Sequence, residues 1–140
     1  RLTADVEIVG ETFPGRPGFF KQEAIDADDY RGVTFLTDKR DGETYVEAKD
    51  FRSFLVYKNM DLTGCNAFEC AMSAPSGDVE ILLADNKTGK VLGKAGGTGT
   101  GSLTKFTSFT CDVTAEAGLT ELRIVFTKQT SLKWFRFYTV

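Results

Sequence analysis

Alternation of inward and outward side chains is clearest between residues 50 and 62. Leu55 and Tyr57 alternate with Phe54, Val56 and Lys58, so one row can face a core while the other lies on an open sheet surface. No apolar row at helical spacing competes with this pattern. The alternation predicts one long, half-buried strand, and its place between strand-like segments at 42–46 and 67–72 predicts that this strand is central.

The same alternation recurs along most of the chain, with turn residues between its repeats. A first strand is predicted near residues 19–25. The alternating apolar positions further along are Val79, Ile81, Leu83, Leu122, Ile124, Phe126, Phe135 and Phe137. About nine or ten short strands of this kind predict an all-β fold, an antiparallel β-sandwich of the jelly-roll type.

A glycine-rich segment at 95–101 has the composition of a phosphate-binding loop. It lacks both the Gly-Lys-Ser/Thr ending and the following helix that such loops require, so phosphate binding is excluded here. We expect a surface loop whose backbone closely approaches a ligand or a neighbouring segment.

Length and composition fit one globular domain. A chain of 140 residues can bury about two thirds of its unfolded surface. Residues 1–18, rich in Gly and Pro, are expected to form a linker excised from a longer chain, and residues 19–140 the domain. A net charge of −3 with interspersed signs argues against nucleic acid as a partner, and no apolar run reaches the length that spans a membrane.

The chain contains no histidine. This removes Ser–His and Cys–His nucleophile pairs, histidine-ligated zinc and the commonest general base near neutral pH. Cys65, Cys70 and Cys111 permit at most one disulfide and match no zinc pattern. Buried free thiols are favoured, although a Cys65–Cys70 bridge remains open, and so does the redox compartment.

A series of short segments follows a consistent order between residues 19 and 139: 25–30, 42–46, 54–61, 77–85, 89–93, 98–99, 109–113, 118 with 122–126, and 134–137. Their order and spacing resemble the family 6 carbohydrate-binding modules that accompany bacterial glycoside hydrolases. The resemblance implies a non-catalytic module that targets an appended hydrolase, such as an arabinofuranosidase or xylosidase, to xylan, arabinan or β-glucan in plant cell walls. It also implies a secreted or cell-surface location in bacteria, with a cytoplasmic location left open.

The resemblance further implies two places where sugar can bind. At the loop-end site of the family, stacking aromatics and an asparagine are replaced here by Ala48, Leu103 and Ser131, so we expect that site to be lost. At the other site, on an open sheet face, Phe54 takes the stacking position. Further candidates for contact with sugar are Lys58, Arg123, Tyr45 and Trp134. For Phe54 and Trp134, packing against the rest of the fold is the alternative role.

A structural calcium ion is also implied by the resemblance. Asp26 and Asp28 match two of the family's ligands, whereas Lys133 stands at the third ligand position. An ammonium group cannot coordinate calcium, which needs six to eight oxygen ligands, and it repels the ion. We therefore expect a fold that does not depend on calcium, in which the Lys133 head replaces the ion. If it binds no ion, the acidic segment that contains Asp26 and Asp28 is expected to be a solvated turn.

Two other functions compete with sugar binding. The first is a structural appendage with the same fold that packs on a catalytic domain and has lost its sugar sites. The second is a small carboxylate-based glycosidase, which is disfavoured because no carboxylate pair, Glu80 and Asp85 included, can be assigned to a cleft.

Overall fold

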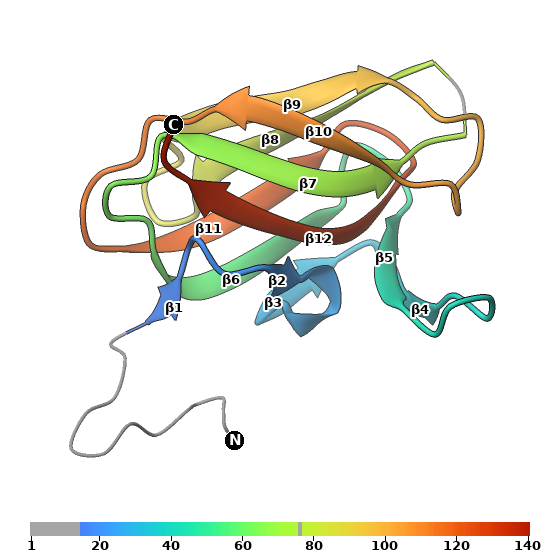
Figure 1. Ribbon diagram of the computed structural model, residues 1–140, viewed down its shortest axis with the longest axis horizontal. Helices are drawn as coiled ribbons and strands as arrows, with labels where there is room; N and C mark the ends of the chain where they lie inside the picture. The colour runs from blue at the N-terminus through green and yellow to red at the C-terminus, as the bar shows by residue number, and fades with distance from the viewer. Residues whose placement is uncertain (1–14, 76) are drawn as a thin grey trace.

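Two β-sheets face each other in a computed structural model that describes residues 15–75 and 77–140 (Figure 1). Each sheet has six strands within the described residues, and the only helix there is a single 3₁₀ turn, η1 (Ala24–Asp26). The predicted all-β sandwich is therefore confirmed. Most of the predicted linker, residues 1–14, lies outside the described residues.

The first sheet has the strand order β1-β6-β11-β8-β9, with β3 also paired to β6. Its strands are β1 (Arg16–Pro17), β3 (Asp29–Arg31), β6 (Phe54–Asp61), β8 (Asp78–Asp85), β9 (Val91–Thr98) and β11 (Leu119–Phe126). The organising strand of the sequence is β6, and it has neighbours on both sides, as predicted. Those neighbours are not the strands that precede and follow it in the chain, because both of these pair in the other sheet.

The second sheet has the order β10-β7-β12-β5-β4, with β2 also paired to β12. Its strands are β2 (Gln22–Glu23), β4 (Val33–Thr37), β5 (Thr44–Ala48), β7 (Ala67–Ser73), β10 (Thr107–Asp112) and β12 (Thr130–Tyr138). In Figure 1 this sheet lies in front, with β7 and β12 at its centre. Consecutive strands lie in different sheets except for the hairpins β4–β5 and β8–β9.

The inward rows form a single core, and its centre is aromatic. Phe68 and Phe137 pack edge to face with ring centroids 5.1 Å apart, and Tyr57 packs edge-on against Phe135 at 4.8 Å. All four side chains are fully buried. Because Tyr57 belongs to the first sheet and the three phenylalanines to the second, this cluster holds the sheets together.

Two segments differ from their predicted structure. The strand predicted at 19–25 is only Gln22–Glu23, because the chain turns into η1 and buries Ala24. Only part of the glycine-rich segment is a loop: residues 95–98 belong to β9, whereas residues 99–101 follow the strand. At Gly96 a Cβ atom would collide with the Val79 carbonyl of the neighbouring strand, so glycine there permits close strand approach.

The three cysteines are free thiols, and burial raises the pKa of each. Cys65 and Cys70 are buried and Cys111 is half-buried, which agrees with the favoured structural role. Among the described residues, no helix is long and apolar enough to cross a membrane.

The substitution Tyr57→Phe tests how much the Tyr57 hydroxyl contributes to the stability of the aromatic core. The Tyr57 hydroxyl donates a 2.6 Å hydrogen bond to the carbonyl of Ala24, and its ring is fully buried. Removing the donor leaves that carbonyl without its partner, so we expect a loss of about 1–3 kcal/mol in the free energy of unfolding. Urea denaturation of both proteins measures it, and an unchanged midpoint would contradict this role.

Candidate functional site

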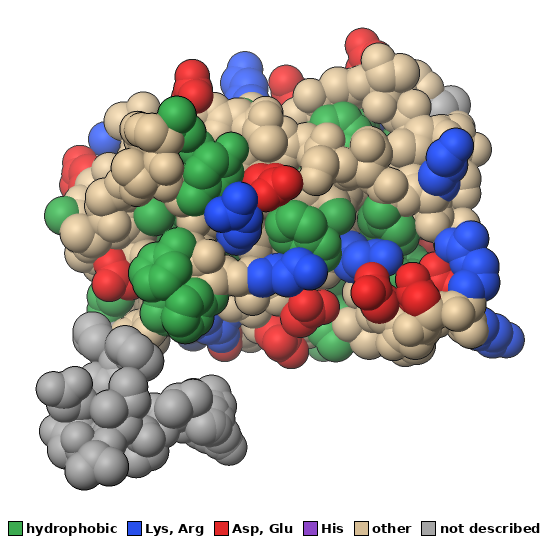
Figure 2. Space-filling model, in the orientation of Figure 1, with side chains coloured by type: hydrophobic (Ala, Val, Ile, Leu, Met, Phe, Trp, Pro, Cys, Tyr) green, Lys and Arg blue, Asp and Glu red, His purple; other side chains and the backbone are tan. Residues whose placement is uncertain are grey.

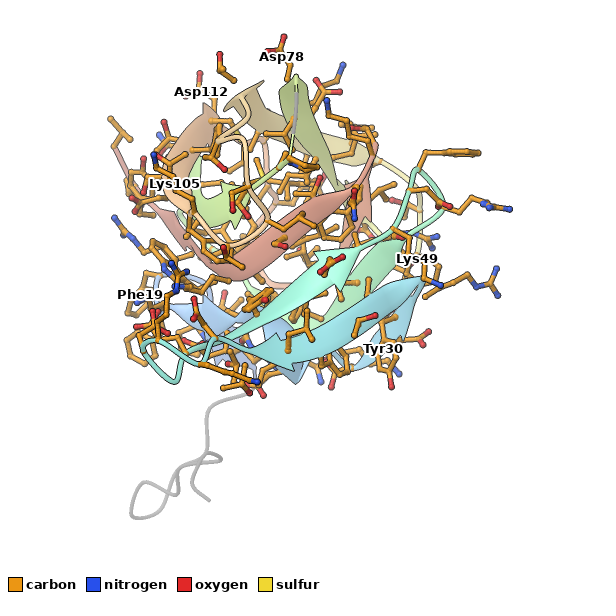
Figure 3. The ribbon with its side chains drawn as sticks, turned by 90° about the vertical axis from the view of Figure 1, so that its right-hand side faces the viewer. Phe19, Tyr30, Lys49, Asp78, Lys105 and Asp112 are labelled. Atoms are coloured by element: carbon orange, nitrogen blue, oxygen red, sulfur yellow. The ribbon has the colours of Figure 1, made fainter. Side chains whose placement is uncertain are left out.

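A groove of about 490 Å³ opens on the outer side of the first sheet, beside the turn between β5 and β6. Strands β3, β6 and β11 supply its base, and the turn supplies one wall. The lining residues are Arg31, Gly32, Lys49, Asp50, Phe51, Arg52, Ser53, Phe54, Arg123 and Val125. Figure 3 labels Lys49 on this turn and Tyr30 on the adjacent strand, with Phe19 on the opposite side of the molecule.

The Ser53 hydroxyl shapes the turn. It donates to the Gly32 carbonyl at 2.7 Å and accepts from the backbone amides of Lys49 at 3.1 Å and Asp50 at 3.3 Å. Ser53 itself is fully buried. Gly32 has a φ of 69°, and a Cβ there would lie 2.7 Å from the Ser53 hydroxyl, so the contact requires glycine. One buried hydroxyl therefore fixes both sides of the groove.

Asp50 and Arg52 close the turn and leave Phe51 at its tip. The Asp50 carboxylate accepts from the Arg52 amide at 2.8 Å and from its guanidinium at 3.2 Å. The first of these bonds is the main reason that the pKa of Asp50 is lowered, so the carboxylate stays ionised in neutral solution. Phe51 is 68% exposed. Phe51 was not among the predicted site residues. The available signal in the sequence was a Phe between an Asp and an Arg in a turn.

Phe54 lies on the groove floor between two arginines. The Arg123 guanidinium carbon is 4.0 Å from the centroid of the Phe54 ring, and that of Arg31 is 5.9 Å away. Arg31 reaches the ring from β3 and Arg123 from β11, which flank β6 on opposite sides. Phe54 is thus half-buried, and Arg123 stacks on it by a cation–π contact. The exposed aromatic surface of the groove is mainly that of Phe51.

Arg123 is held in place from its other side. Its Nη1 donates to the Asn86 side-chain oxygen at 3.0 Å, and the Asn86 amide nitrogen donates to Glu121 at 2.6 Å. Asn86 therefore separates the Glu121 carboxylate from the guanidinium and orients both. The guanidinium is left with donors that point to no described acceptor.

The other sugar-contact candidates lie away from this pair. Lys58 is exposed on the same face of β6, about 13 Å along the strand from Phe54 at about 3.3 Å per residue, and it does not line the groove. Tyr45 and Trp134 belong to the second sheet. Tyr45 is buried against Phe106, and Lys21 covers the Trp134 ring at 4.6 Å. The structure brings together only Phe54 and Arg123.

The loop-end residues are packed into the second sheet. Ala48 and Ser131 are fully buried, and Leu103 is half-buried. Ser131 lies opposite Ser73 on the neighbouring strand, and neither hydroxyl has a hydrogen-bond partner among the described residues. These side chains present no aromatic surface to a sugar.

Lys133 lies at the edge of a second, smaller hollow of about 250 Å³ in that sheet. Its Nζ is 2.8 Å from a Glu43 oxygen, 3.8 Å from an Asp41 oxygen and 4.5 Å from the centre of the Phe106 ring. Glu23 lines the same hollow, and burial raises its pKa. Only 13% of the Lys133 side chain is exposed. Sequence reasoning identified the lysine but not these acidic partners.

Comparison with known proteins settles the family. The model of the carbohydrate binding module (family 6) matches residues 23–139. The chain belongs to this family. Its members are non-catalytic carbohydrate-binding modules, so the expectation that this chain is not an enzyme is confirmed. A search of curated proteins finds no match.

Solved structures of family 6 modules share the fold. A Clostridium cellulolyticum module in complex with xylose is 26% identical, with a TM-score of 0.76 over 87% of this chain and 98% of its own. CsCBM6-3 from Clostridium stercorarium, in complex with cellobiose, is 18% identical, with a TM-score of 0.83 over 90% and 98%. A family 43 arabinoxylan arabinofuranohydrolase from Bacillus subtilis, in complex with cellotetraose, is 15% identical, with a TM-score of 0.81 over 93% of this chain and 29% of the hydrolase.

The calcium ion that the resemblance implies does not fit this module. Asp28 is engaged elsewhere: one of its oxygens accepts from Arg16 at 2.7 Å and from the Lys58 amide at 2.7 Å. The Asp26 side chain is exposed on η1. Among the described residues, Lys133 forms its ion pairs with Glu43 and Asp41 rather than with Asp26 or Asp28, and its ammonium cannot coordinate a cation.

Ser53→Ala should weaken both the fold and the groove. The substitution removes one donated and two accepted hydrogen bonds from a fully buried site, so we expect a loss of about 1–3 kcal/mol in the free energy of unfolding. Chemical denaturation measures the loss. Amide NMR shifts should change around Gly32 and residues 49–52. A variant with unchanged stability and spectra would show that the turn does not depend on this hydroxyl.

Lys133→Met should destabilise the module, whereas calcium and chelators should leave the native protein unchanged. Without the ammonium, Glu43 and Asp41 repel each other and the contact with Phe106 is lost, at a cost of about 1–2 kcal/mol. Thermal melts with calcium or a chelator measure both effects, and Lys105→Met, at an exposed lysine, is the control. If chelation lowers the native melting temperature and calcium restores it, the lysine has not replaced the ion.

Proposed function

We propose that this module binds a polysaccharide chain in the groove between the 49–53 turn and strands β3, β6 and β11. The observation that carries the proposal is the exposed ring of Phe51 beside Phe54 in a concave surface that is rich in hydrogen-bond donors. A sugar ring has an apolar C–H face and polar hydroxyls around its rim. It therefore requires aromatic surface for the face and donors for the hydroxyls.

A xylan, arabinan or β-glucan chain is the proposed ligand class. The family membership supports a plant-cell-wall glycan, and the similarity to modules solved with xylose and with cellobiose supports β-linked chains. The groove is shallow and the free aromatic surface is that of one ring. We therefore expect a dissociation constant between high micromolar and millimolar, about 4–6 kcal/mol of binding free energy.

An appended glycoside hydrolase is the proposed partner, acting outside the cell or at its surface. The similarity to part of an arabinoxylan arabinofuranohydrolase supports this arrangement. Weak binding suffices in that role, because the module raises the local concentration of enzyme at the polysaccharide. The alternative, a structural appendage without sugar binding, would require Phe51 to be covered by the catalytic domain.

Phe51→Ala and Phe54→Ala test the groove. Phe51 is largely exposed, so its removal should leave the fold intact and weaken binding at least fivefold, because stacking area is lost. Phe54→Ala should weaken binding similarly, since Arg123 then loses the ring on which it stacks. NMR titration with xylan, arabinan and β-glucan fragments measures both, after circular dichroism has shown that the variants are folded.

The matched control is Phe19→Ala, because Phe19 is 60% exposed and lies on the opposite side of the molecule from the groove (Figure 3). It should leave binding unchanged. Two results would refute the groove: affinity that survives both groove substitutions, or shifted resonances that cluster around Ala48, Leu103 and Ser131.

A further inference from the structure

Positive charge is concentrated in the groove of a module that is acidic as a whole. The net charge of the chain is −3, yet four cationic side chains and one carboxylate line the groove. The cations are Arg31, Lys49, Arg52 and Arg123, and the carboxylate is Asp50. The local field of the groove therefore has the opposite sign to the charge of the protein.

Three of these four cations take part in no ion pair in the part of the chain that the structure describes. Arg31, Lys49 and Arg123 are the three, and only Arg52 is paired, with Asp50 at 3.2 Å. Some cations elsewhere in the described residues are paired, as Arg16 is with Asp28 at 2.7 Å. Glu121 approaches Arg123 only through Asn86. What distinguishes the groove is that several unpaired cations share one concave surface with a single carboxylate.

Hydrogen-bond donors outnumber acceptors among the side chains of the groove. Arginine and lysine side chains donate hydrogen bonds and accept none. The two acceptor side chains of the lining, Asp50 and Ser53, already accept hydrogen bonds within the turn. A neutral sugar hydroxyl both donates and accepts, whereas a carboxylate or sulfate only accepts. This excess of donors therefore suits a ligand that carries an acceptor-only group.

We propose that the groove selects an acidic glycan, whose carboxylate or sulfate group binds Arg31, Lys49 and the free donors of Arg123 while a sugar ring packs on Phe51. This inference rests on the proposed sugar-binding function and names the chemical class of its ligand. The planar guanidinium groups suit such anions, because they present paired N–H donors to two oxygens at once. Asp50 does not repel the ligand, since Arg52 neutralises it.

The experiment compares three xylotetraose probes: unsubstituted, bearing one glucuronic acid branch, and sulfated. Titration calorimetry or NMR titration of the module is carried out at 20 mM and at 300 mM NaCl. We expect at least one acidic probe to bind roughly tenfold more tightly than the neutral probe at low salt, and this advantage to shrink at high salt through screening. Which acidic probe binds more tightly identifies the anion.

Substitutions at two groove cations test whether the preference for acidic probes arises in the groove. The double substitution of Arg31→Gln and Lys49→Gln should weaken binding of the preferred acidic probe roughly tenfold, from about two- to fivefold per exposed cation. Binding of the neutral probe should weaken much less, because Gln can still form hydrogen bonds with its hydroxyls. Lys87→Gln, at an exposed lysine outside the groove, should change neither.

The experiment has three outcomes that would contradict different parts of the proposal. Equal binding of neutral and acidic probes by the native module would overturn the acidic selectivity and keep the proposed function. An acidic preference that survives the double substitution would overturn the assignment to this groove. Failure of all probes, together with neutral xylan, arabinan and β-glucan fragments, would overturn the proposed function as well.

Discussion

Tyr57 is the side chain by which the first sheet enters the aromatic cluster of the second, and its hydroxyl donates a hydrogen bond to the Ala24 carbonyl. Tyr57 projects inward from β6 in the first sheet, whereas Ala24 lies in η1, directly after the strand that pairs with β12 in the second. The same tyrosine ring packs edge-on against Phe135 of β12. Burial raises the pKa of Tyr57 and keeps the hydroxyl a donor. Tyr57 thus adds a directional polar contact to the apolar packing that joins the two sheets.

The geometry of the groove depends on strand β6. Inward-facing Leu55 and Tyr57 hold β6 against the core, and the alternation then obliges Phe54 to face outward. Immediately before the strand, Ser53 is buried, and its carbonyl accepts from the Phe126 amide while its hydroxyl binds Gly32. The aromatic and cationic side chains at the rim are therefore supported by the same hydrogen bonds and core packing that stabilise the sandwich.

The parts of this structure that the sequence predicts are those governed by a repeating local pattern. Alternation along β6, β11 and β12 was enough to predict the sheets and to place Phe54 and Arg123 on an outer face. The partners of Lys133 were not predictable, because Asp41 and Glu43 reach it from a turn about 90 residues away in sequence, through a contact that only the assembled sheet creates. Close backbone approach at the glycine-rich segment was expected, but the strand at residues 95–98 was not, because it depends on pairing with β8, which local pattern does not specify. Phe51 was missed because a single exposed aromatic in a turn has no periodicity.

The two outer faces of the sandwich differ in the arrangement of their charged side chains. On the β7–β12 face, basic and acidic side chains are interspersed (Figure 2), and Arg136 pairs with Glu69 at 3.0 Å as Lys133 does with Glu43 at 2.8 Å. Pairs at the surface add little to stability, whereas the Lys133 side chain is largely buried, and both pairs leave this face with little net field. The groove has the opposite arrangement, with unpaired cations over an aromatic floor. Like charges within one groove repel each other, although Arg123 and Arg31 also pack on the Phe54 ring. The proposed binding role accounts for the excess of positive charge, because an anionic ligand would supply the missing charge and accept the unused hydrogen bonds.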